Sequence, residues 1–443
     1  MTRHVMRIAH RAAAIGALVL LAACDLDQPN PNAPTEEATL TTPDGIIAVA
    51  VGVQARYGAS TGDFIYGAGL VTDELGALSS ALVNISDAEQ GIVTPGAGFS
   101  ASLWNSSYRT VKSANDLIVN TPNVELDPGT RSGIMALAYV LKAGALGHVL
   151  QGFQQLPIDT YRRTQPVFVS RAEALAEILA LLDSAETALD AQAPSAQFTN
   201  SILAPGFDLR NTLYAYRARY ARIAGDDETA LAAANAVSRT VFSVLPYSAT
   251  DPNPIFTLAS GSSGVAPRDE FRIAGGTAEA ARVGFHVTQA ALIGRINTPL
   301  DNYARYSSNA ASIPTYYPDE PLLIKAEALV NLNRLPEAIA ALDSVRNDCG
   351  APVASDPNAC LGAYGGPVTA ADILTEIYRN RRFELFATGL RWEDTRRRGQ
   401  IGKDSPGKRC WLPYTIGERN ANGNVPPDPE GTEPPASPAT CTS

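Results

Sequence analysis

The sequence has few basic residues, few histidines and few tryptophans. Its 35 Lys and Arg residues face 45 Asp and Glu residues, which gives a formal net charge of -10 at pH 7. Nucleic acids and anionic lipid surfaces attract basic proteins, so this balance argues against both as extended electrostatic partners. Only four histidines and three tryptophans occur in 443 residues. The sequence therefore offers few residues for histidine-based catalysis or for a broad aromatic binding platform.

The sequence also gives little support for an enzyme. An H-E-x-x-H zinc motif and a Walker phosphate loop are absent, and we expect no serine nucleophile elbow. Two histidines remain beyond the N-terminal segment, His148 and His286, and His148 falls among small residues where packing explains it better than catalysis. Asp and Glu are too numerous to single out a glycosidase pair. We therefore expect no catalytic site and no cofactor.

The first 24 residues have the features of a lipoprotein export signal. A basic start is followed by the twelve-residue apolar run from Ala12 to Ala23, and Leu21-Ala22-Ala23-Cys24 closes it. Twelve apolar residues are too few for a permanent membrane span. The pattern predicts a signal peptide over residues 1–23 and thioether lipidation of Cys24; a plain signal peptide with a chance cysteine is the alternative. Because Asp25 directly follows the cysteine, the inner membrane is an alternative site of anchoring.

The next segment is polar and rich in proline. Residues 25–35 read DLDQPNPNAPT, which favours solvated, extended backbone and cannot bury a core. We expect a tether over residues 24–40 and one folded domain over 41–443. With 45% hydrophobic residues, that domain can bury a large core, and we expect no second run long enough to span a membrane.

Four cysteines follow the export signal, an even number in a chain predicted to be exported. They are Cys349, Cys360, Cys410 and Cys441, and four cysteines allow three pairings that sequence cannot separate. We predict Cys349 with Cys360 and Cys410 with Cys441, since each bridge closes a loop within one segment and the second holds the Pro-rich tail. Zinc is the alternative, but the spacings are not those of zinc fingers, so we expect no metal site.

Helix signals occur in consecutive pairs along the body. The predicted helices cover residues 134–153, 170–189, 208–224, 226–239, 318–332 and 336–346, with a capping box at Ser170 and Glu173 and a left-handed cap at Gly225. The last two pairs align, with Ala230 over Ala338 and Val237 over Val345. Small residues at such positions let helices approach closely, as in tetratricopeptide-like repeats. We predict a mainly α fold of such helix pairs, with a loop-rich irregular half and little β structure.

The stretch from Thr369 to Gly399 predicts one helix of about seven turns. Its apolar stripe contains Arg381, and a guanidinium in that position needs a carboxylate. The carboxylates within reach along a helix are Glu376, Glu384, Glu393 and Asp394. A structural ion pair explains this arginine better than catalysis.

The same stretch resembles the C-terminal signature of the SusD/RagB family of outer-membrane nutrient-binding lipoproteins, approximately E-R-R-x-E-L-x-x-E-G-x-R-W-x-D-L-R-R. The matching residues are Arg381, Arg382, Glu384, Leu385, Gly389, Arg391, Trp392, Asp394, Arg396 and Arg397. Asn380 and Thr388 replace acidic residues of the pattern. The resemblance implies structural ion pairs made by Arg381, Arg382, Glu384 and Asp394.

Two further segments resemble the same family. The matches are Leu322, Leu323, Ala326, Glu327, Ala328, Ala338, Leu342, Val345 and Arg346 in one segment and, more weakly, Trp104, Tyr108, Ala114 and Asn115 in the other. The resemblance implies a surface-exposed, lipid-anchored protein of the outer membrane. Such a protein binds an oligosaccharide or similar nutrient and docks as a lid on a SusC-like TonB-dependent transporter barrel.

Ligand binding calls for exposed aromatic faces and convergent polar groups. Two segments predicted to be loops, residues 62–80 and 301–306, carry such side chains. The candidate ligand-binding residues are Tyr66, Asp73, Trp104, Tyr303, Arg305 and Tyr306, with packing as the alternative for each. We assign Tyr316 and Tyr317 to the core. Because tryptophan is scarce, a peptide is an alternative to a sugar as the nutrient. The other functional classes are a helical scaffold that binds proteins and an exported hydrolase.

Overall fold

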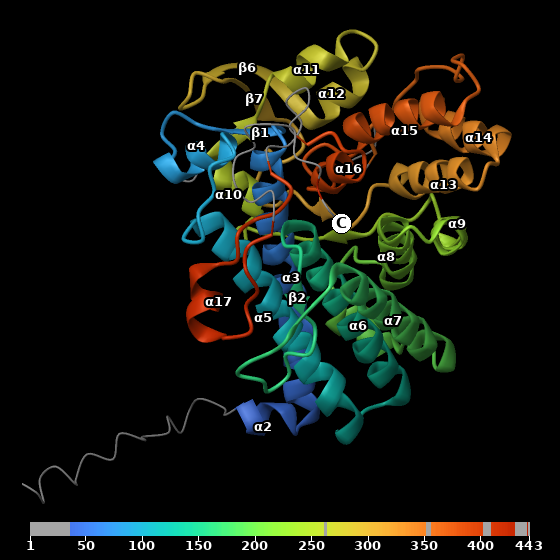
Figure 1. The fold of residues 1–443 in the computed structure, drawn as a ribbon. Helices are drawn as coiled ribbons and strands as arrows, with labels where there is room; N and C mark the ends of the chain where they lie inside the picture. The colour runs from blue at the N-terminus through green and yellow to red at the C-terminus, as the bar shows by residue number, and fades with distance from the viewer. Residues whose placement is uncertain (1–35, 261–263, 351–355, 402–408, 430–440, 442–443) are drawn as a thin grey trace, which may run out of the picture.

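Three long helices, α3 (Pro43–Val71), α5 (Gly98–Asn120) and α6 (Pro128–Gly152), lie against one another in the centre of the protein (Figure 1). The computed structural model describes residues 36–260, 264–350, 356–401, 409–429 and 441. Cys24 and most of the predicted tether lie outside this range. Residues 36–40 already form the short helix α2 (Glu36–Leu40), with Leu40 buried.

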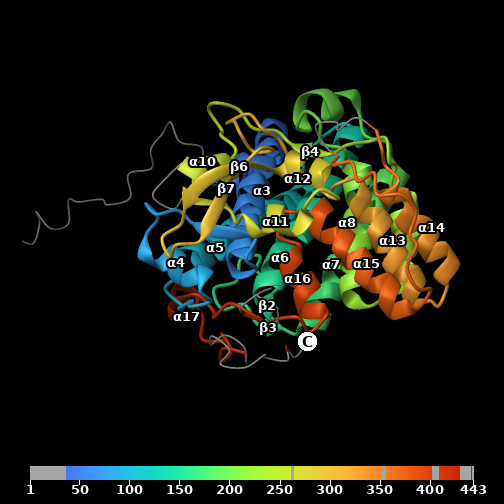
Figure 2. The ribbon, with the colours of Figure 1, turned by 90° about the horizontal axis from the view of Figure 1, so that it is seen from above.

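Helix pairs extend from this centre along one side of the molecule. The helices are α7 (Arg171–Ala191), α8 (Leu209–Ala224), α9 (Asp227–Ala236), α13 (Asp319–Asn331), α14 (Leu335–Arg346) and α15 (Ala370–Glu384). Packing runs from α6 to α7 and α8, then through α9 to α13, which contacts α14 and α15 (Figure 2). Ala230 and Ala338 are fully buried. The predicted class, a mainly α fold with tetratricopeptide-like pairs, is therefore confirmed.

Outside the long helices the chain is irregular and contains short antiparallel strand pairs. They are β1 (Leu75–Ala77) with β5 (Val265–Pro267), β2 (Leu156–Pro157) with β3 (Phe168–Val169), β4 (Val244–Leu245) with β8 (Ile313–Pro314), and β6 (Val287–Ile293) with β7 (Pro299–Tyr303). Short helices fill the spaces: α4 (Val83–Glu89), η1 (Thr121–Asn123), η2 (Phe198–Ile202), α10 (Pro254–Ser260), α11 (Glu270–Gly275), α12 (Ala280–His286), α16 (Arg391–Arg397) and α17 (Ile416–Ala421).

Three predicted segments differ in the structure, and one of them, the loop predicted at residues 301–306, belongs to strand β7 up to Tyr303. The single helix predicted from Thr369 to Gly399 is broken between α15 and α16, where Ala387 and Gly389 have φ values of 53° and 82°. A left-handed backbone cannot continue an α-helix, and a side chain at Gly389 would collide with the Phe64 ring. The predicted loop at residues 62–80 is also wrong in part, because α3 continues to Val71.

Helix α6 is apolar because it is surrounded by protein. Contrary to the expectation from sequence, it is long and apolar enough to cross a membrane, but most of it is buried inside the fold. Helices α3, α5, α7 and α8 all pack against it. Gly144 and Gly147 allow the tyrosines of α3 and α8 to approach its backbone, and a Cβ at Gly147 would stand 1.9 Å from the Tyr220 hydroxyl oxygen.

Two glycine substitutions should therefore have opposite effects on stability. Gly147→Ala overpacks the core against Tyr220 and is expected to lower the free energy of unfolding by about 1–3 kcal/mol. Gly52→Ala in α3, where no atom lies within 4 Å of the new methyl group, is expected to raise it by about 0.5–1 kcal/mol. Denaturant unfolding measures both, and a stabilising Gly147→Ala would contradict the close packing.

Both predicted disulfide bridges are present. Cys349 is bonded to Cys360, and Cys410 is bonded to Cys441. Cys410 is buried, and its carbonyl oxygen accepts hydrogen bonds from Arg396 of α16. The second bridge thus joins Cys441 to a segment that is already fixed in the core.

Candidate functional site

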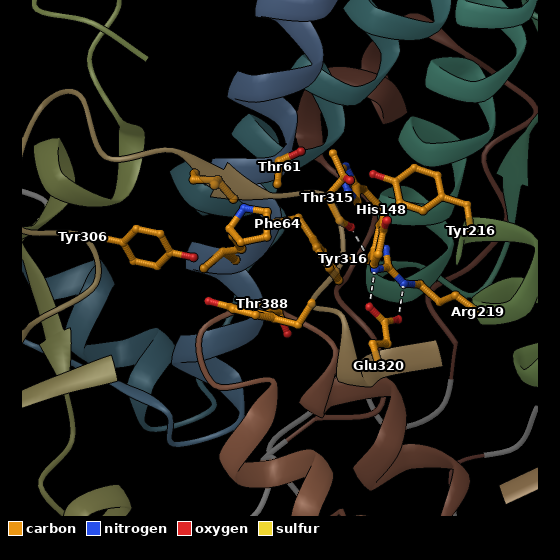
Figure 3. A pocket seen from close by; sticks show the side chains of 14 residues that line it. Thr61, Phe64, His148, Tyr216, Arg219, Tyr306, Thr315, Tyr316, Glu320 and Thr388 are labelled. Atoms are coloured by element: carbon orange, nitrogen blue, oxygen red, sulfur yellow. Dashed lines mark hydrogen bonds and ion pairs between the residues drawn. The ribbon is translucent and has the colours of Figure 1, made fainter. Parts of the chain in front are cut away.

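A small enclosed cavity lies among α3, α6, α8 and the chain that leads into α13 (Figure 3). Its volume is about 20 Å³, room for about one water molecule. Arg219 closes one side through a bidentate ion pair with Glu320, with both N–O distances at 2.7 Å. A nutrient cannot enter a cavity of this size.

His148, which lines this cavity, forms a serine–histidine pair that the sequence analysis did not identify. Residues 58–62 read GASTG, which has the G-x-S-x-G spacing, and Ser60 Oγ lies 2.9 Å from His148 Nδ1. A nucleophile elbow requires an exposed serine at a sharp strand-to-helix turn, whereas Ser60 is in the middle of α3 and completely buried. The pair is therefore part of the core packing.

The His148 ring lies between Tyr57 and Phe64, with centroid distances of 5.3 and 4.8 Å. Burial, with the nearby Arg219 charge, lowers the pKa of His148 to about 3. The ring is therefore neutral in the folded protein at pH 5, whereas in the unfolded chain it binds a proton below pH 6.5.

This difference predicts a pH-dependent loss of stability. Between pH 7 and pH 5 the unfolded state gains a proton at His148 that the folded state does not, so acidification favours unfolding by about 2 kcal/mol at this residue. In His148→Gln, the fall in unfolding free energy between these pH values should be smaller than in the wild type by that amount. Denaturant unfolding at both pH values measures it; equal pH dependence would contradict a neutral buried ring.

The predicted ligand-binding tyrosines come together, but below the surface. Tyr66, Tyr303 and Tyr306 are 4%, 8% and 2% exposed, and the last two rings lie 6.0 Å apart. Within the described part of the chain, their hydroxyl groups have no hydrogen-bond partner. The expectation of exposed aromatic faces is therefore wrong for these three rings, and their contact with a ligand stays a prediction.

The polar candidates beside them are also engaged in the fold. Asp73, which is largely buried, forms an ion pair with Arg268. The Arg305 guanidinium lies over the rings of Phe285 and Tyr306 at 5.8 and 5.9 Å from their centroids. These contacts favour packing over an open binding surface.

The motif residues of the C-terminal segment form the predicted ion pairs, with one exception. Arg381 Nε is 2.7 Å from Asp394 Oδ2, and Glu384 Oε1 is 2.8 Å from Arg282 Nη1. Arg382 differs, since no carboxylate of the described residues lies within 4 Å of its guanidinium; burial and the nearby Arg391 lower its pKa to about 10. Asn380, at an acidic position of the pattern, accepts a hydrogen bond from Arg282.

An open cleft of about 470 Å³ lies between α5, the chain around β2 and β3, and α17; we name it the α5–α17 cleft. Asn105 and Arg109 of α5 are exposed along it, and Thr160 and Thr164 add hydroxyl groups opposite. No carboxylate of the described residues lies within 4 Å of the Arg109 guanidinium, whereas Lys112 and Arg163 are paired with acids. The cleft thus offers amide, hydroxyl and guanidinium donors to a ligand.

Aromatic rings form the base of this cleft. Trp104 packs on Tyr108 at 4.8 Å, on Phe153 at 4.9 Å and on Phe168 at 5.9 Å. Its ring is only 3% exposed, and its indole nitrogen donates to Glu418 of α17. Of the predicted ligand-binding residues, Trp104 alone lines this cleft, where it supports the half-buried Tyr108 ring.

Comparison with known proteins identifies the C-terminal segment. A model of the SusD family matches residues 307–427, which include α13 to α17 and the ion pair of Arg381 and Asp394. Over these residues the chain is similar to the SusD family, which agrees with the resemblance of the C-terminal motif. No curated protein sequence matches the chain.

Solved structures of SusD-like proteins share the fold over nearly their whole length. A SusD superfamily protein from Bacteroides thetaiotaomicron is 15% identical with a TM-score of 0.68, covering 88% of this chain and 100% of that one. The protein NanU from B. fragilis is 15% identical with a TM-score of 0.66, covering 91% and 100%. A SusD-like carbohydrate binding protein from B. vulgatus is 15% identical with a TM-score of 0.62, covering 79% and 82%. At these identities the likeness establishes the SusD-like fold.

Proposed function

We propose that this protein is a lipid-anchored protein of the outer membrane, facing the cell surface, that binds an oligosaccharide or similar oligomeric nutrient and delivers it to a SusC-like TonB-dependent transporter. The observation that carries the proposal is the SusD family match over residues 307–427. The carbohydrate binding protein among the structural neighbours supports a sugar as the nutrient. In this proposal residues 1–23 are the signal peptide, Cys24 carries the lipid, and the tether ends before α2, so that the single domain begins at Glu36 and not at residue 41.

We place the nutrient in the α5–α17 cleft. Its volume of about 470 Å³ is within the range of small-molecule sites. Tyr108 gives a partly exposed aromatic surface, and Asn105 and Arg109 give donors for hydroxyl or carboxylate oxygens. Charge-assisted hydrogen bonds from arginine are among the stronger polar contacts, so Arg109 is the residue with the largest expected part in binding.

A calorimetric titration tests this placement. Neutral oligosaccharides, uronic-acid oligosaccharides and peptides are titrated into the protein, and the class that binds is titrated into Arg109→Gln. Loss of one charge-assisted hydrogen bond is worth about 1.5–3 kcal/mol, so the affinity should fall at least about tenfold. Arg210→Gln, an exposed arginine on α8 paired with Asp190, is the matched control and should bind as the wild type does.

The possible outcomes distinguish an incorrect binding site from an incorrect function. A ligand that binds Arg109→Gln as tightly as the wild type would move the site elsewhere and leave nutrient binding standing. Purification from native outer membranes in mild detergent tests whether the protein delivers its ligand to a transporter. The expected result is a TonB-dependent barrel that co-purifies in stoichiometric amount. Absence of both a ligand and a barrel would contradict the proposal.

A second groove favours the alternative function, a helical scaffold that binds proteins. It has a volume of about 640 Å³ and follows α7 to the end of α8, where Leu175, Leu179 and Ile223 contribute apolar surface. Grooves of this kind receive amphipathic peptide helices. Recovery of another protein instead of the barrel would support this alternative, provided that this protein no longer co-purifies with the Leu179→Asp variant.

A further inference from the structure

Three acidic side chains from separate segments meet in the interior of the fold. Asp319 is the first residue of α13, Glu384 is the last residue of α15, and Asp356 lies between the bonded cysteines Cys349 and Cys360. One carboxylate oxygen from each residue lies within 4.8 Å of the other two. Asp319 and Glu384 are 0% exposed and Asp356 is 8% exposed.

Each of these carboxylates has an oxygen without a partner. Among the described residues, Asp319 Oδ2, Asp356 Oδ1 and Glu384 Oε2 are buried and make no hydrogen bond. A buried polar atom without a partner costs free energy, and native proteins satisfy most of them with protein, water or an ion. Three such oxygens in one place indicate that a further group completes the cluster.

The surrounding positive charge does not balance the cluster. Arg282 Nη1 is 2.8 Å from Glu384 Oε1, but the same guanidinium also binds Glu279. Arg239 Nη2 is 3.2 Å from Asp319 Oδ1, and its side chain is half exposed. Asp348 adds a further negative charge near Asp319 and Asp356. The three carboxylates therefore have an excess of negative charge that a cation would neutralise.

We propose that Asp319, Asp356 and Glu384 form a binding site for a divalent cation of the calcium type. Calcium prefers oxygen ligands at about 2.3–2.6 Å and takes carboxylates together with water and carbonyl oxygens. Three oxygens that are at most 4.8 Å apart lie within about 2.8 Å of a common point, so an inward shift of a few tenths of an ångström brings all three to one ion. The set contains neither nitrogen nor sulfur, which argues against zinc and copper.

Protons are the competing occupants. Burial raises the pKa of Asp319 to about 6 and that of Asp356 to about 8, and it raises the pKa of Glu384 well above its ordinary value. Binding of the cation releases such protons, so its affinity should increase between pH 6 and pH 8. The ion would also tie the segment that contains Asp356 to the ends of α13 and α15.

Titration of the EDTA-treated full-length chain with CaCl2 tests the site. We expect saturable binding with one ion per chain, a thermal midpoint that rises with Ca²⁺ concentration, and a weaker response to MgCl2. Asp356→Asn keeps the size of the side chain, removes one charge and is expected to reduce Ca²⁺ affinity at least tenfold. Glu337→Gln, an exposed acid on α14, is the matched control and should leave the affinity unchanged.

Two results would overturn the proposal. In the first, the wild-type protein binds none of Ca²⁺, Mg²⁺ and Mn²⁺ at millimolar concentration, and EDTA does not change its thermal midpoint. The other is an Asp356→Asn variant that binds Ca²⁺ as tightly as the wild type. A circular dichroism spectrum and the cation-free midpoint of Asp356→Asn show whether the variant folds, and Asp319→Asn repeats the test from α13.

Discussion

Replacing Asp394 with alanine is expected to lower the free energy of unfolding by about 3–5 kcal/mol, because it leaves two buried cations without their shared partner. Asp394 Oδ1 is 3.0 Å from Arg222 Nη1, and its Oδ2 is 2.7 Å from Arg381 Nε. The two arginines are 1% and 2% exposed. Water therefore cannot solvate their guanidinium groups once the carboxylate is gone.

The loss should be large because the pair belongs to a network that joins four helices. Arg222 of α8 also binds Glu327 of α13 at 2.9 Å, and Glu327 accepts hydrogen bonds from Tyr378 and Arg397. Burial alone would raise the pKa of Asp394, but the Arg381 and Arg222 charges outweigh it and hold this pKa below the ordinary value. Its contribution is therefore present above pH 3.8 and is lost as the pH falls through the lowered pKa.

Denaturant unfolding at pH 7 measures this effect, with the exposed pair of Arg334 and Glu337 as the control. Glu337→Ala should leave the unfolding midpoint unchanged, since exposed ion pairs contribute little. The difference between wild type and Asp394→Ala should narrow under strongly acidic conditions. An Asp394→Ala protein as stable as the Glu337→Ala control would contradict a stabilising role for the network.

Removing the bridge between Cys410 and Cys441 is expected to lower the free energy of unfolding by about 3–4 kcal/mol. The bridge closes a loop with a sequence separation of 31 residues, and a cross-link of that length restricts the unfolded chain by roughly this amount. The loop contains α17, whose Glu418 accepts a hydrogen bond from Trp104. Cys441→Ser therefore removes one of several attachments of the segment that forms this wall of the α5–α17 cleft.

The paired serine variants test the length dependence. Replacing Cys410 and Cys441 together should cost more than replacing Cys349 and Cys360, whose separation is 11 residues, by about 1 kcal/mol in the loop-entropy model. Unfolding under non-reducing conditions measures both. Ligand affinity is a second readout, since a loosened α17 should weaken binding in the cleft. A Cys410/Cys441 double variant as stable as the wild type would contradict the prediction.

Local signals in the sequence predicted several helix ends correctly, although α6 begins six residues before its predicted start and α9 ends three residues before its predicted end. The capping box of Ser170 and Glu173 opens α7, Asp208 caps α8, and Gly225 ends α8 with a φ of 78°. These features depend on residues three or four positions apart, which the sequence contains directly. The tetratricopeptide-like pairs followed from the same signals, and the C-terminal motif led to the family.

Helix α3 and the break after α15 could not be predicted in the same way. Helix α3 is buried on most of its surface, so it lacks the polar face that makes a helix visible as a periodic pattern. The break depends on the left-handed conformation of Ala387 and Gly389 and on the Phe64 ring beside Gly389. The break changes the direction of the chain and brings Asp394 to Arg381. From the sequence alone, four carboxylates were candidates for this ion pair.

The sequence by itself therefore determined the fold class, the helix pairs and the motif that resembles the family, because each depends on short-range spacing or on a run of residues within the C-terminal segment. Tertiary structure decided which of the candidate residues are buried and which line a cleft. It buried Tyr66, Tyr303 and Tyr306, placed Trp104 against Glu418 across 314 residues of sequence, and gathered three carboxylates from three segments. Burial and long-range contact arise only when the helices pack, and no local pattern records them.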